Sequence, residues 1–280
     1  MRWLQAIFRQ APSHKYAINA ALLGDPAELP WSNLGYWHSS AQDYPAACQQ
    51  LADHLAEAVQ LQSTDRLLDL GCGQGASLLH WQQHYQLSNI TAVELQTTCV
   101  EQIQARWPAL PIYAQSFLNL KNLMPLAPFD VVLCIDAAYH HALNSFLDAV
   151  QPVLNSKGRL GFHTLILSPQ FLNSNTLQQH AYRALLKAAD VSLPELKTVV
   201  QLEQCLQERG FTQIQIEDLS APVLNGFAEY IQQLHWLQHS PGLDRIKIAM
   251  TAKLCRRLYK DGWVRYVQVT ARNKAEKIAS

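Results

Sequence analysis

The order of hydrophobic and polar residues predicts alternating strands and helices from about residue 65 onward. Short apolar runs with the character of buried strands occupy 66–70, 89–93, 111–114, 129–135 and 159–167. Apolar residues at helical spacing fill the intervals 76–86, 97–107 and 143–154. This alternation is typical of right-handed βαβ units, whose helices cover both faces of a parallel sheet. We therefore predict an α/β fold with a Rossmann-like, doubly wound, mostly parallel sheet.

Both ends of the chain depart from this pattern. Residues 1–60 predict a helical cap or lid, with Trp3, Leu4, Ile7 and Phe8 on one face of a first short helix and a longer helix over about 45–60. Residues 61–169 form the predicted ligand-binding core. Residues 170–280 predict inserted cap helices and two late strands, at 211–217 and 263–270, which we expect to form an antiparallel edge of a mixed sheet.

The amino-acid composition limits the classes of molecule that the chain is expected to bind. The 280 residues suffice for a sizeable core, and Lys+Arg and Asp+Glu are both 22, giving a net charge of +0. A neutral chain has no overall field to attract nucleic acid, so we expect no nucleic-acid partner. One basic concentration lies within 245–260. It predicts a solvated amphipathic helix, while contact with an anionic substrate group or a membrane surface stays open.

Six cysteines lack any Cys-x-x-Cys spacing, which favours free thiols in a reducing compartment. The N-terminus lacks the features of a signal peptide, and no run approaches the ~18 apolar residues of a membrane span. We therefore expect a cytoplasmic protein without stable membrane insertion. His80 and His84 have a spacing that metal ligands use, but no evident third ligand, so we predict no metal site.

The loop Asp69-Leu-Gly-Cys-Gly-Gln-Gly75 lies between a predicted strand and a predicted helix. Open parallel sheets bind ligands at this position, outside the carboxyl ends of their strands. Gly71 and Gly73 allow a tight turn and a close approach of the backbone, and Gly75 allows the helix to pack on the strand. Glu94, which ends the next strand, can accept hydrogen bonds from both hydroxyls of a ribose.

A dinucleotide and S-adenosylmethionine both fit a glycine loop followed by an acidic residue. Asp69 distinguishes them, because it would face the pyrophosphate of a dinucleotide. At ~4 Å and an effective dielectric constant of ~20, that repulsion costs about 4 kcal/mol per pair of charges. S-adenosylmethionine instead carries an ammonium group and a sulfonium, for which a nearby carboxylate is favourable. The loop therefore favours S-adenosylmethionine.

These residues resemble those of class I S-adenosylmethionine-dependent methyltransferases. Asn33-Leu-Gly-Tyr-Trp37 and Tyr139-His-His141 are similar to a branch that methylates sugars, polyketides, quinones, terpenoids and sterols. The resemblance implies that Leu95 packs on adenine. The family usually has Gly-Asp-Ala after the third strand, where this chain has Ala114-Gln115-Ser116. The implied cofactor-binding residues are Asp69, Gly71, Cys72, Gly73, Gly75, Glu94, Leu95, Gln115, Ser116, Asp136 and Tyr36.

Four residues are candidates for catalysis. His140 and His141 follow the fourth strand, where the resemblance implies a histidine that accepts a proton from the acceptor; either could instead only orient its loop. Asp136 could act as a base or cap the same loop. Tyr36 could contact the ligand or pack as an aromatic anchor, as could Trp37. His163, on the fifth strand, is a candidate substrate contact or a buried structural histidine.

The sequence thus predicts an S-adenosylmethionine-dependent methyltransferase that acts on oxygen or carbon of a small, largely apolar molecule. Two alternatives remain: an NAD(P)-dependent oxidoreductase, and a non-catalytic nucleotide-binding protein of the same fold. Assembly as a homodimer stays open.

Overall fold

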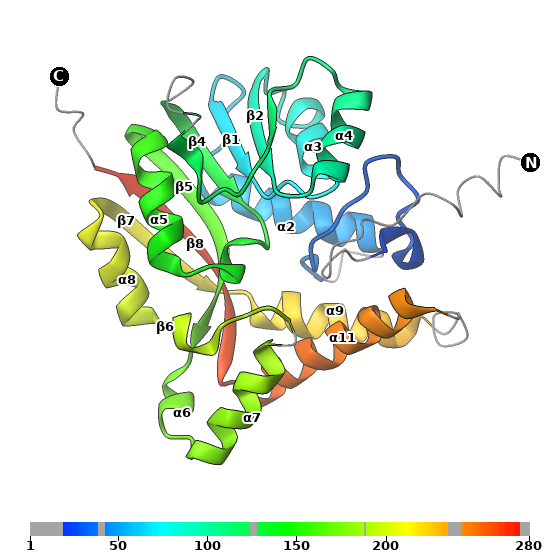
Figure 1. The fold of residues 1–280 in the computed structure, drawn as a ribbon, viewed down its shortest axis with the longest axis vertical. Helices are drawn as coiled ribbons and strands as arrows, with labels where there is room; N and C mark the ends of the chain where they lie inside the picture. Colours follow the sequence, from blue (N-terminus) through cyan, green and yellow to red (C-terminus); the bar gives the residue numbers. More distant parts are fainter. Residues whose placement is uncertain are drawn as a thin grey trace, which may run out of the picture.

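A mixed sheet forms the centre of the molecule in the computed structural model, which describes residues 19–38, 43–121, 123, 128–187, 189–234 and 242–274 (Figure 1). The sheet has eight strands, seven of them in the order β3-β2-β1-β4-β5-β8-β7, with β6 beside β5. The strands are β1 Arg66–Leu70, β2 Asn89–Glu94, β3 Ile112–Ala114, β4 Phe129–Cys134, β5 Leu154–Leu167, β6 Lys197–Thr198, β7 Phe211–Asp218 and β8 Val264–Asn273.

The first five strands pair in parallel, which confirms the predicted Rossmann-like fold class. β8 pairs antiparallel with β5 on one side and with β7 on the other. The two late strands therefore form the antiparallel edge of the mixed sheet, as predicted, with β7 outermost. Parallel β4 and β5 end at the same border of the sheet as β1, so the loops after these strands meet there.

Helices cover both faces of the sheet, and two buried clusters hold them there. The helices are α2 Tyr44–Ala58, α3 Ala76–Gln83, α4 Thr97–Arg106, α5 Leu143–Val150 and α8 Val199–Glu208. On one face, Leu55 of α2 and Trp81 of α3 pack with Val131 and Leu133 of β4. On the other face, α5 and α8 pack against alternate residues of the same strands, such as Val132. Alternate burial of this kind follows from the two-residue period of a strand.

A third cluster lies beyond the carboxyl ends of the strands and builds the cap. The cap comprises residues 19–38 with the 3₁₀-helix Ala20–Leu23, and the helices α6 Pro169–Leu172, α7 Thr176–Lys187, α9 Gly226–Gln233 and α11 Leu243–Asp261. Figure 1 shows α9 and α11 side by side below α2. Leu51 of α2, Phe227 of α9 and Tyr266 of β8 belong to the same buried cluster, so the cap and the sheet share one core.

Local sequence explains where several helices begin and end. Asp43 caps α2 by accepting a hydrogen bond from the Ala46 amide, and Pro45 stands in the first turn, where no amide hydrogen is needed. Thr198 and Gln201 form a reciprocal capping box at the start of α8. Gly262 ends α11 in the left-handed conformation, with φ 66°.

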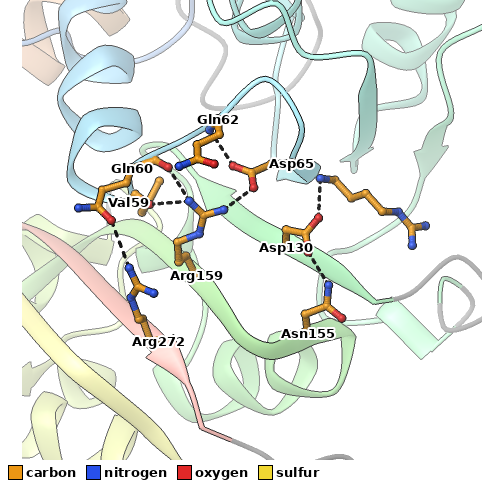
Figure 2. Close-up of polar contacts among 9 residues, drawn as sticks. Val59, Gln60, Gln62, Asp65, Asp130, Asn155, Arg159 and Arg272 are labelled. Atoms are coloured by element: carbon orange, nitrogen blue, oxygen red, sulfur yellow. Dashed lines mark hydrogen bonds and ion pairs between the residues drawn. The ribbon is translucent and has the colours of Figure 1, made fainter.

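Arg159 of β5 fastens the segment between α2 and β1 at the amino end of the sheet (Figure 2). Its guanidinium donates to the carbonyl oxygens of Val59 and Gln60 and forms an ion pair with Asp65. The Asp65 carboxylate also accepts from the Gln62 amide at 2.7 Å. Both partners of the ion pair are largely buried, with 14% and 8% of their side chains exposed. The arginine therefore satisfies backbone groups that end α2.

Three further contacts continue this network (Figure 2). Asp130 of β4 accepts from the Arg66 amide at 2.9 Å and from the Asn155 side chain. Arg272 of β8 donates to the Gln60 side chain at 3.2 Å. These contacts join β4, β5 and β8 at the border of the sheet that lies opposite the glycine loop.

The predicted elements agree with the structure in order, and differ at their ends. β5 begins at Leu154, where a helix end had been expected, and its pairing with β4 shifts register between Phe129 and Val131. The two-residue strand β6 was not predicted. The first short helix predicted around Trp3 and Phe8 lies outside the described residues. The proposed boundaries at residues 60 and 169 remain predictions.

Replacing Arg159 with alanine should lower the free energy of unfolding by on the order of 3 kcal/mol, because Asp65 would be left largely buried without its cation. Urea unfolding followed by tryptophan fluorescence measures this change. Arg106→Ala is the control, since the Arg106–Glu28 pair is exposed and should contribute less than about 1 kcal/mol. Equal effects of the two substitutions would contradict the role given to Arg159.

Candidate active site

A hollow of about 440 Å³, open to solvent, lies at the carboxyl ends of β1 and β4. The sheet, the glycine loop and the cap all contribute to its wall. The lining residues are Pro30, Trp31, Ser32, Asn33, Asp69, Gly71, Cys72, Ala76, Ser77, Ile135, Asp136 and Ala137.

The glycine loop turns in a conformation that side chains disfavour. Gly71, Gly73 and Gly75 have φ values of 72°, 56° and 94°. A Cβ atom added at Gly73 would collide with the Ser32 hydroxyl of the cap, and one at Gly75 would lie 2.7 Å from Ile103 of α4. The loop therefore needs glycine for its turn and also for the close approach of the cap and of α4.

Asp69 reaches the hollow from within the sheet. It is 1% exposed, and its Oδ2 atom accepts hydrogen bonds from the Ser77 hydroxyl at 2.9 Å and the Trp81 indole at 2.7 Å. Within the described part of the chain, both of these bonds end on Oδ2, which leaves Oδ1 available to a ligand. Burial raises the pKa of Asp69 to about 6, although the bonds from Trp81 and Ser77 act in the opposite direction.

Glu94 links the glycine loop to the end of β2. One carboxylate oxygen accepts from the Gly73 amide and the other from the Gln96 amide, each at 2.9 Å. The residue is 6% exposed. Each carboxylate oxygen has two lone pairs, so Glu94 has more acceptor sites than these two hydrogen bonds occupy.

Asp136 connects the tip of β4 to the cap. Its carboxylate accepts from the Leu34 amide at 2.9 Å and from the Tyr139 hydroxyl at 2.7 Å. Its φ of 54° is unusual for a residue with a side chain and turns the chain sharply after the strand. Burial raises the pKa of Asp136 to about 6, against the effect of these two donors. One carboxylate therefore holds two walls of the hollow together.

The cap loop that closes the hollow is itself fixed by short contacts. The Asn33 side chain accepts from the Gly35 amide at 2.8 Å, and the Asn33 carbonyl accepts from the Tyr44 hydroxyl at 2.8 Å. Asp25 accepts from the Trp31 amide at 2.7 Å. The residues on both sides of Ser32 are thus held by α2 and by the preceding turn.

The comparison with protein families matches residues 67–158 to a methyltransferase domain. These residues include the glycine loop and Asp136, which line the hollow, and Glu94, which accepts from the Gly73 amide. Residues 67–158 are a methyltransferase domain.

Two bacterial methyltransferases are similar in sequence. Erythromycin 3''-O-methyltransferase of Saccharopolyspora erythraea is 33% identical over 91 residues, which are 31% of this chain and 30% of the relative. The match with 27-O-demethylrifamycin SV methyltransferase of Amycolatopsis mediterranei is longer. It is 25% identical over 252 residues, 85% of this chain and 88% of the relative.

Solved structures share the fold across nearly the whole chain. The cyclopropane synthase MmaA2 of Mycobacterium tuberculosis has a TM-score of 0.73 at 16% identity, covering 94% of this chain and 97% of that one. Geranyl diphosphate C-methyltransferase of Streptomyces coelicolor, solved with S-adenosyl-L-homocysteine, has a TM-score of 0.70 at 14% identity, with 98% of each chain covered. The predicted enzyme class, cofactor and fold class are confirmed, and these matches give the oxidoreductase alternative no support.

The hollow and the neighbouring ends of β2 and β3 carry groups that suit S-adenosylmethionine; Asp69 lines the hollow, whereas Glu94 and Gln115 lie outside its lining. Oδ1 of Asp69 is an acceptor for an ammonium group, and the two oxygens of Glu94 are acceptors for ribose hydroxyls. Gln115 donates its side-chain amide to the Asn119 carbonyl at 2.9 Å, which directs its oxygen elsewhere and leaves it able to accept from an adenine amino group. The residues present therefore fit the cofactor.

Three other predicted cofactor contacts have less direct support from the structure. Leu95 is 56% exposed beside Glu94, as a residue that packs on a bound ring would be. Ser116 accepts from the Leu118 amide at 3.2 Å. Cys72 lines the hollow, and burial raises the pKa of its thiol. All three assignments remain predictions.

The candidate catalytic residues do not all meet at the hollow. Asp136 lines it, whereas none of the described lining residues is a histidine. His141 borders a separate small pocket and packs edge-on against Phe117, and burial lowers its pKa. His140 packs on Tyr139. Tyr36 stacks on His54 of α2, with ring centres 5.0 Å apart. The catalytic roles of these residues remain predictions.

The sequence did not reveal that Ser77 and Trp81 orient Asp69, or that Ser32 covers the hollow. Ser77 and Trp81 are four residues apart on α3 and therefore share one face of the helix. This spacing could have indicated a common partner on β1. Ser32 carried no such signal, because its approach to Gly73 depends on how the cap docks. Trp37 packs on Gly226 and stacks on Tyr230 within the cap.

Replacing Gly73 with alanine should weaken binding of S-adenosylhomocysteine at least tenfold, because the new methyl group would displace Ser32 and the roof of the hollow. Isothermal titration calorimetry measures the affinity. Gly210→Ala is a matched control: its φ of +78° imposes similar backbone strain, and nothing lies within 4 Å of the added carbon. A comparable loss of affinity in both variants would show that strain, and not the close approach, is responsible.

Proposed function

We propose that this protein transfers the methyl group of S-adenosylmethionine to a hydroxyl oxygen or a carbon of a small, largely apolar molecule. The observation that carries this proposal is the buried carboxylate of Asp69, which Trp81 and Ser77 hold at the wall of the hollow beside the glycine loop. A fixed anion at that point attracts an ammonium and repels a pyrophosphate.

The cofactor supplies a methyl group on a sulfonium, a good leaving group for in-line displacement. Asp69 holds its ammonium, Glu94 its ribose and Gln115 its adenine. The protein then has to align the acceptor and exclude water from the reacting atoms. Asp136 serves this purpose by joining the end of β4 to the cap, and its junction with Leu34 closes the hollow on the side of the acceptor.

The cap supports a largely apolar acceptor. Its core cluster is formed mainly by aliphatic and aromatic residues from α2, α7, α9 and α11, and it meets the sheet beside Asp136. The two relatives methylate antibiotics according to their names, and a structural neighbour binds geranyl diphosphate. Acceptors of this kind combine an apolar carbon skeleton with oxygen-bearing groups.

His140, His141, Tyr36 and Asp136 remain our candidates for proton transfer or acceptor positioning. Because burial lowers the pKa of His141, its imidazole is neutral near pH 7 and able to accept a proton. All six cysteines are free thiols, which supports a reducing compartment, and we infer the cytoplasm. No helix in the described part of the chain combines the length and apolar character that crossing a membrane requires.

A panel of acceptors tests the proposal directly. The full chain is incubated with S-adenosylmethionine labelled on its methyl group and with a demethylated rifamycin, an erythromycin precursor, geranyl diphosphate or a phospholipid. We expect label to appear in at least one hydroxylated or isoprenoid acceptor, and a Glu94→Ala variant to lose it. Micromolar binding of NADH together with no binding of S-adenosylhomocysteine would refute the proposal.

The affinity for S-adenosylhomocysteine should rise with pH between 5 and 7. The pKa of Asp69 in the free protein is about 6, and the ammonium of the ligand favours the ionised form, so binding releases a proton below pH 6. One ionisation with this pKa allows at most about a tenfold rise over that interval. Calorimetry at several pH values measures it.

Asp69→Asn should remove this pH dependence, and Asp136→Asn serves as the comparison because the pKa of Asp136 is also about 6. If Asp136→Asn abolishes the rise while Asp69→Asn retains it, the ammonium does not bind at Asp69.

A further inference from the structure

One side of the cap helix α11 carries a regular row of exposed side chains, here called the α11 stripe. In Figure 1, α11 lies at the outer border of the cap, next to α9. Positions three and four residues apart in alternation share one side of a helix. The opposite side is buried in the cap cluster through Ile248, Ala252, Cys255 and Leu258. The exposed members of the α11 stripe are Leu243, Ile246, Met250, Lys253, Arg257 and Lys260.

The first half of the α11 stripe is apolar. Leu243, Ile246 and Met250 are 76%, 46% and 58% exposed. Single apolar side chains on a surface are common, whereas adjoining ones on one helix face mark a contact site. At 1.5 Å per residue, the whole stripe is about 25 Å long, of which the apolar half takes the amino-terminal end.

The second half of the α11 stripe is basic, and most of its charge is not neutralised. Arg257 pairs with Asp261 at 3.2 Å, and Asp244, on the same helix, accepts from the Asn19 side chain at 2.9 Å. Within the described parts of the chain, three lysines on or beside the stripe make no ion pair: Lys247, Lys253 and Lys260. The outer face of α11 therefore combines an apolar end with an excess of positive charge.

The α11 stripe is not part of the candidate active site. None of the described residues that line the hollow comes from α11. The side of the helix that packs into the cap is the one opposite the stripe. The basic residues therefore lie outside the hollow, where they cannot hold an anionic group of a molecule bound there.

The order of residues along the α11 stripe disfavours a second copy of this chain as its partner. In a parallel pair of α11 helices, Lys253, Arg257 and Lys260 would each face their own copies, and like charges repel. In an antiparallel pair, the same cations would be buried against the apolar half of the other helix, which costs free energy because they would lose water without gaining a partner.

A surface of anionic phospholipids satisfies both halves at once. Apolar side chains on a surface helix enter the boundary between the headgroups and the acyl chains, and the cations beside them attract the lipid phosphates. We propose that the α11 stripe binds the surface of a membrane that contains anionic phospholipids. The amino-terminal half of α11 lies deeper in this surface, and Lys253, Arg257 and Lys260 lie at the level of the phosphates. This inference goes beyond the proposed function and does not depend on it.

Vesicle binding tests the inference. The full chain is centrifuged with vesicles of phosphatidylcholine alone, or of phosphatidylcholine and phosphatidylglycerol in equal parts. We expect at least tenfold tighter binding to the mixed vesicles, because each basic residue near an anionic surface strengthens binding about fivefold. This preference should disappear when the salt is raised from about 0.1 M to about 1 M, which shortens the Debye length from about 10 Å to about 3 Å.

Two double variants test the two halves of the α11 stripe separately. Ile246→Ser with Met250→Ser should weaken binding to the mixed vesicles at least tenfold, because it removes the side chains that enter the lipid. Leu177→Ser is the control for this loss, since Leu177 is 84% exposed on α7, away from the stripe. These side chains are exposed, so the melting temperature should not fall.

The second double variant changes the charge. Lys247→Glu with Lys253→Glu should remove the preference for the mixed vesicles. Lys121→Glu with Lys157→Glu is the matched control, because it alters the net charge equally at exposed positions outside the cap and should leave the preference in place.

The outcomes separate the lipid surface from other partners of α11. Equal binding to both kinds of vesicle, or no loss in the α11 variants, would overturn the inference. A loss of the same size in the control variants would show that overall charge or hydrophobicity, and not the α11 stripe, is responsible. Absence of vesicle binding, together with self-association that Ile246→Ser with Met250→Ser abolishes in analytical ultracentrifugation, would assign the face to a second copy instead.

Discussion

The hydrogen bonds from Trp81 and Ser77 to Asp69 set the geometry on which the rest of the site depends. They keep a carboxylate at the end of β1, within the core, at a point where burial would otherwise favour its protonated form. The glycine loop starts two residues later, so its position follows from the same anchor. Because both donors lie on α3, the helix that the loop leads into also fixes the carboxylate before it.

The hollow is bounded by elements that meet only after the cap has docked. Ser32 closes over Gly73, and Leu34 donates to Asp136, so both contacts join the cap to the carboxyl ends of the strands. α2 belongs to both layers: Leu51 packs in the cap cluster and Leu55 packs against the sheet. The position of α2 on the sheet therefore determines where the cap covers the hollow.

The hydrophobic periodicity of the sequence was sufficient to predict the central fold, because parallel strands that are buried on both faces appear as continuous apolar runs between helices. The turn of the glycine loop was also predictable from its glycines, which have positive φ values, whereas the cofactor contacts assigned to Asp69 and Glu94 remain predictions. Contacts that depend on long-range strand pairing were not predictable. His163 and Tyr266 are separated by about a hundred residues, and the antiparallel pairing of β5 with β8 brings their rings together. The length of β5 was missed for a related reason, as the ladder with β8 extends it.

The place of β8 in the sheet has a consequence for how the chain matures. β5 pairs with β8 from Arg159 to Leu167, yet β8 leaves the ribosome after every other described strand. Until β8 has been synthesised, the edge of β5 lacks this partner, β7 has no strand to join, and the ring of His163 lacks the Gln268 side chain. The parallel strands around the glycine loop can pair early in the nascent chain, whereas β7 cannot join the sheet before β8 is released.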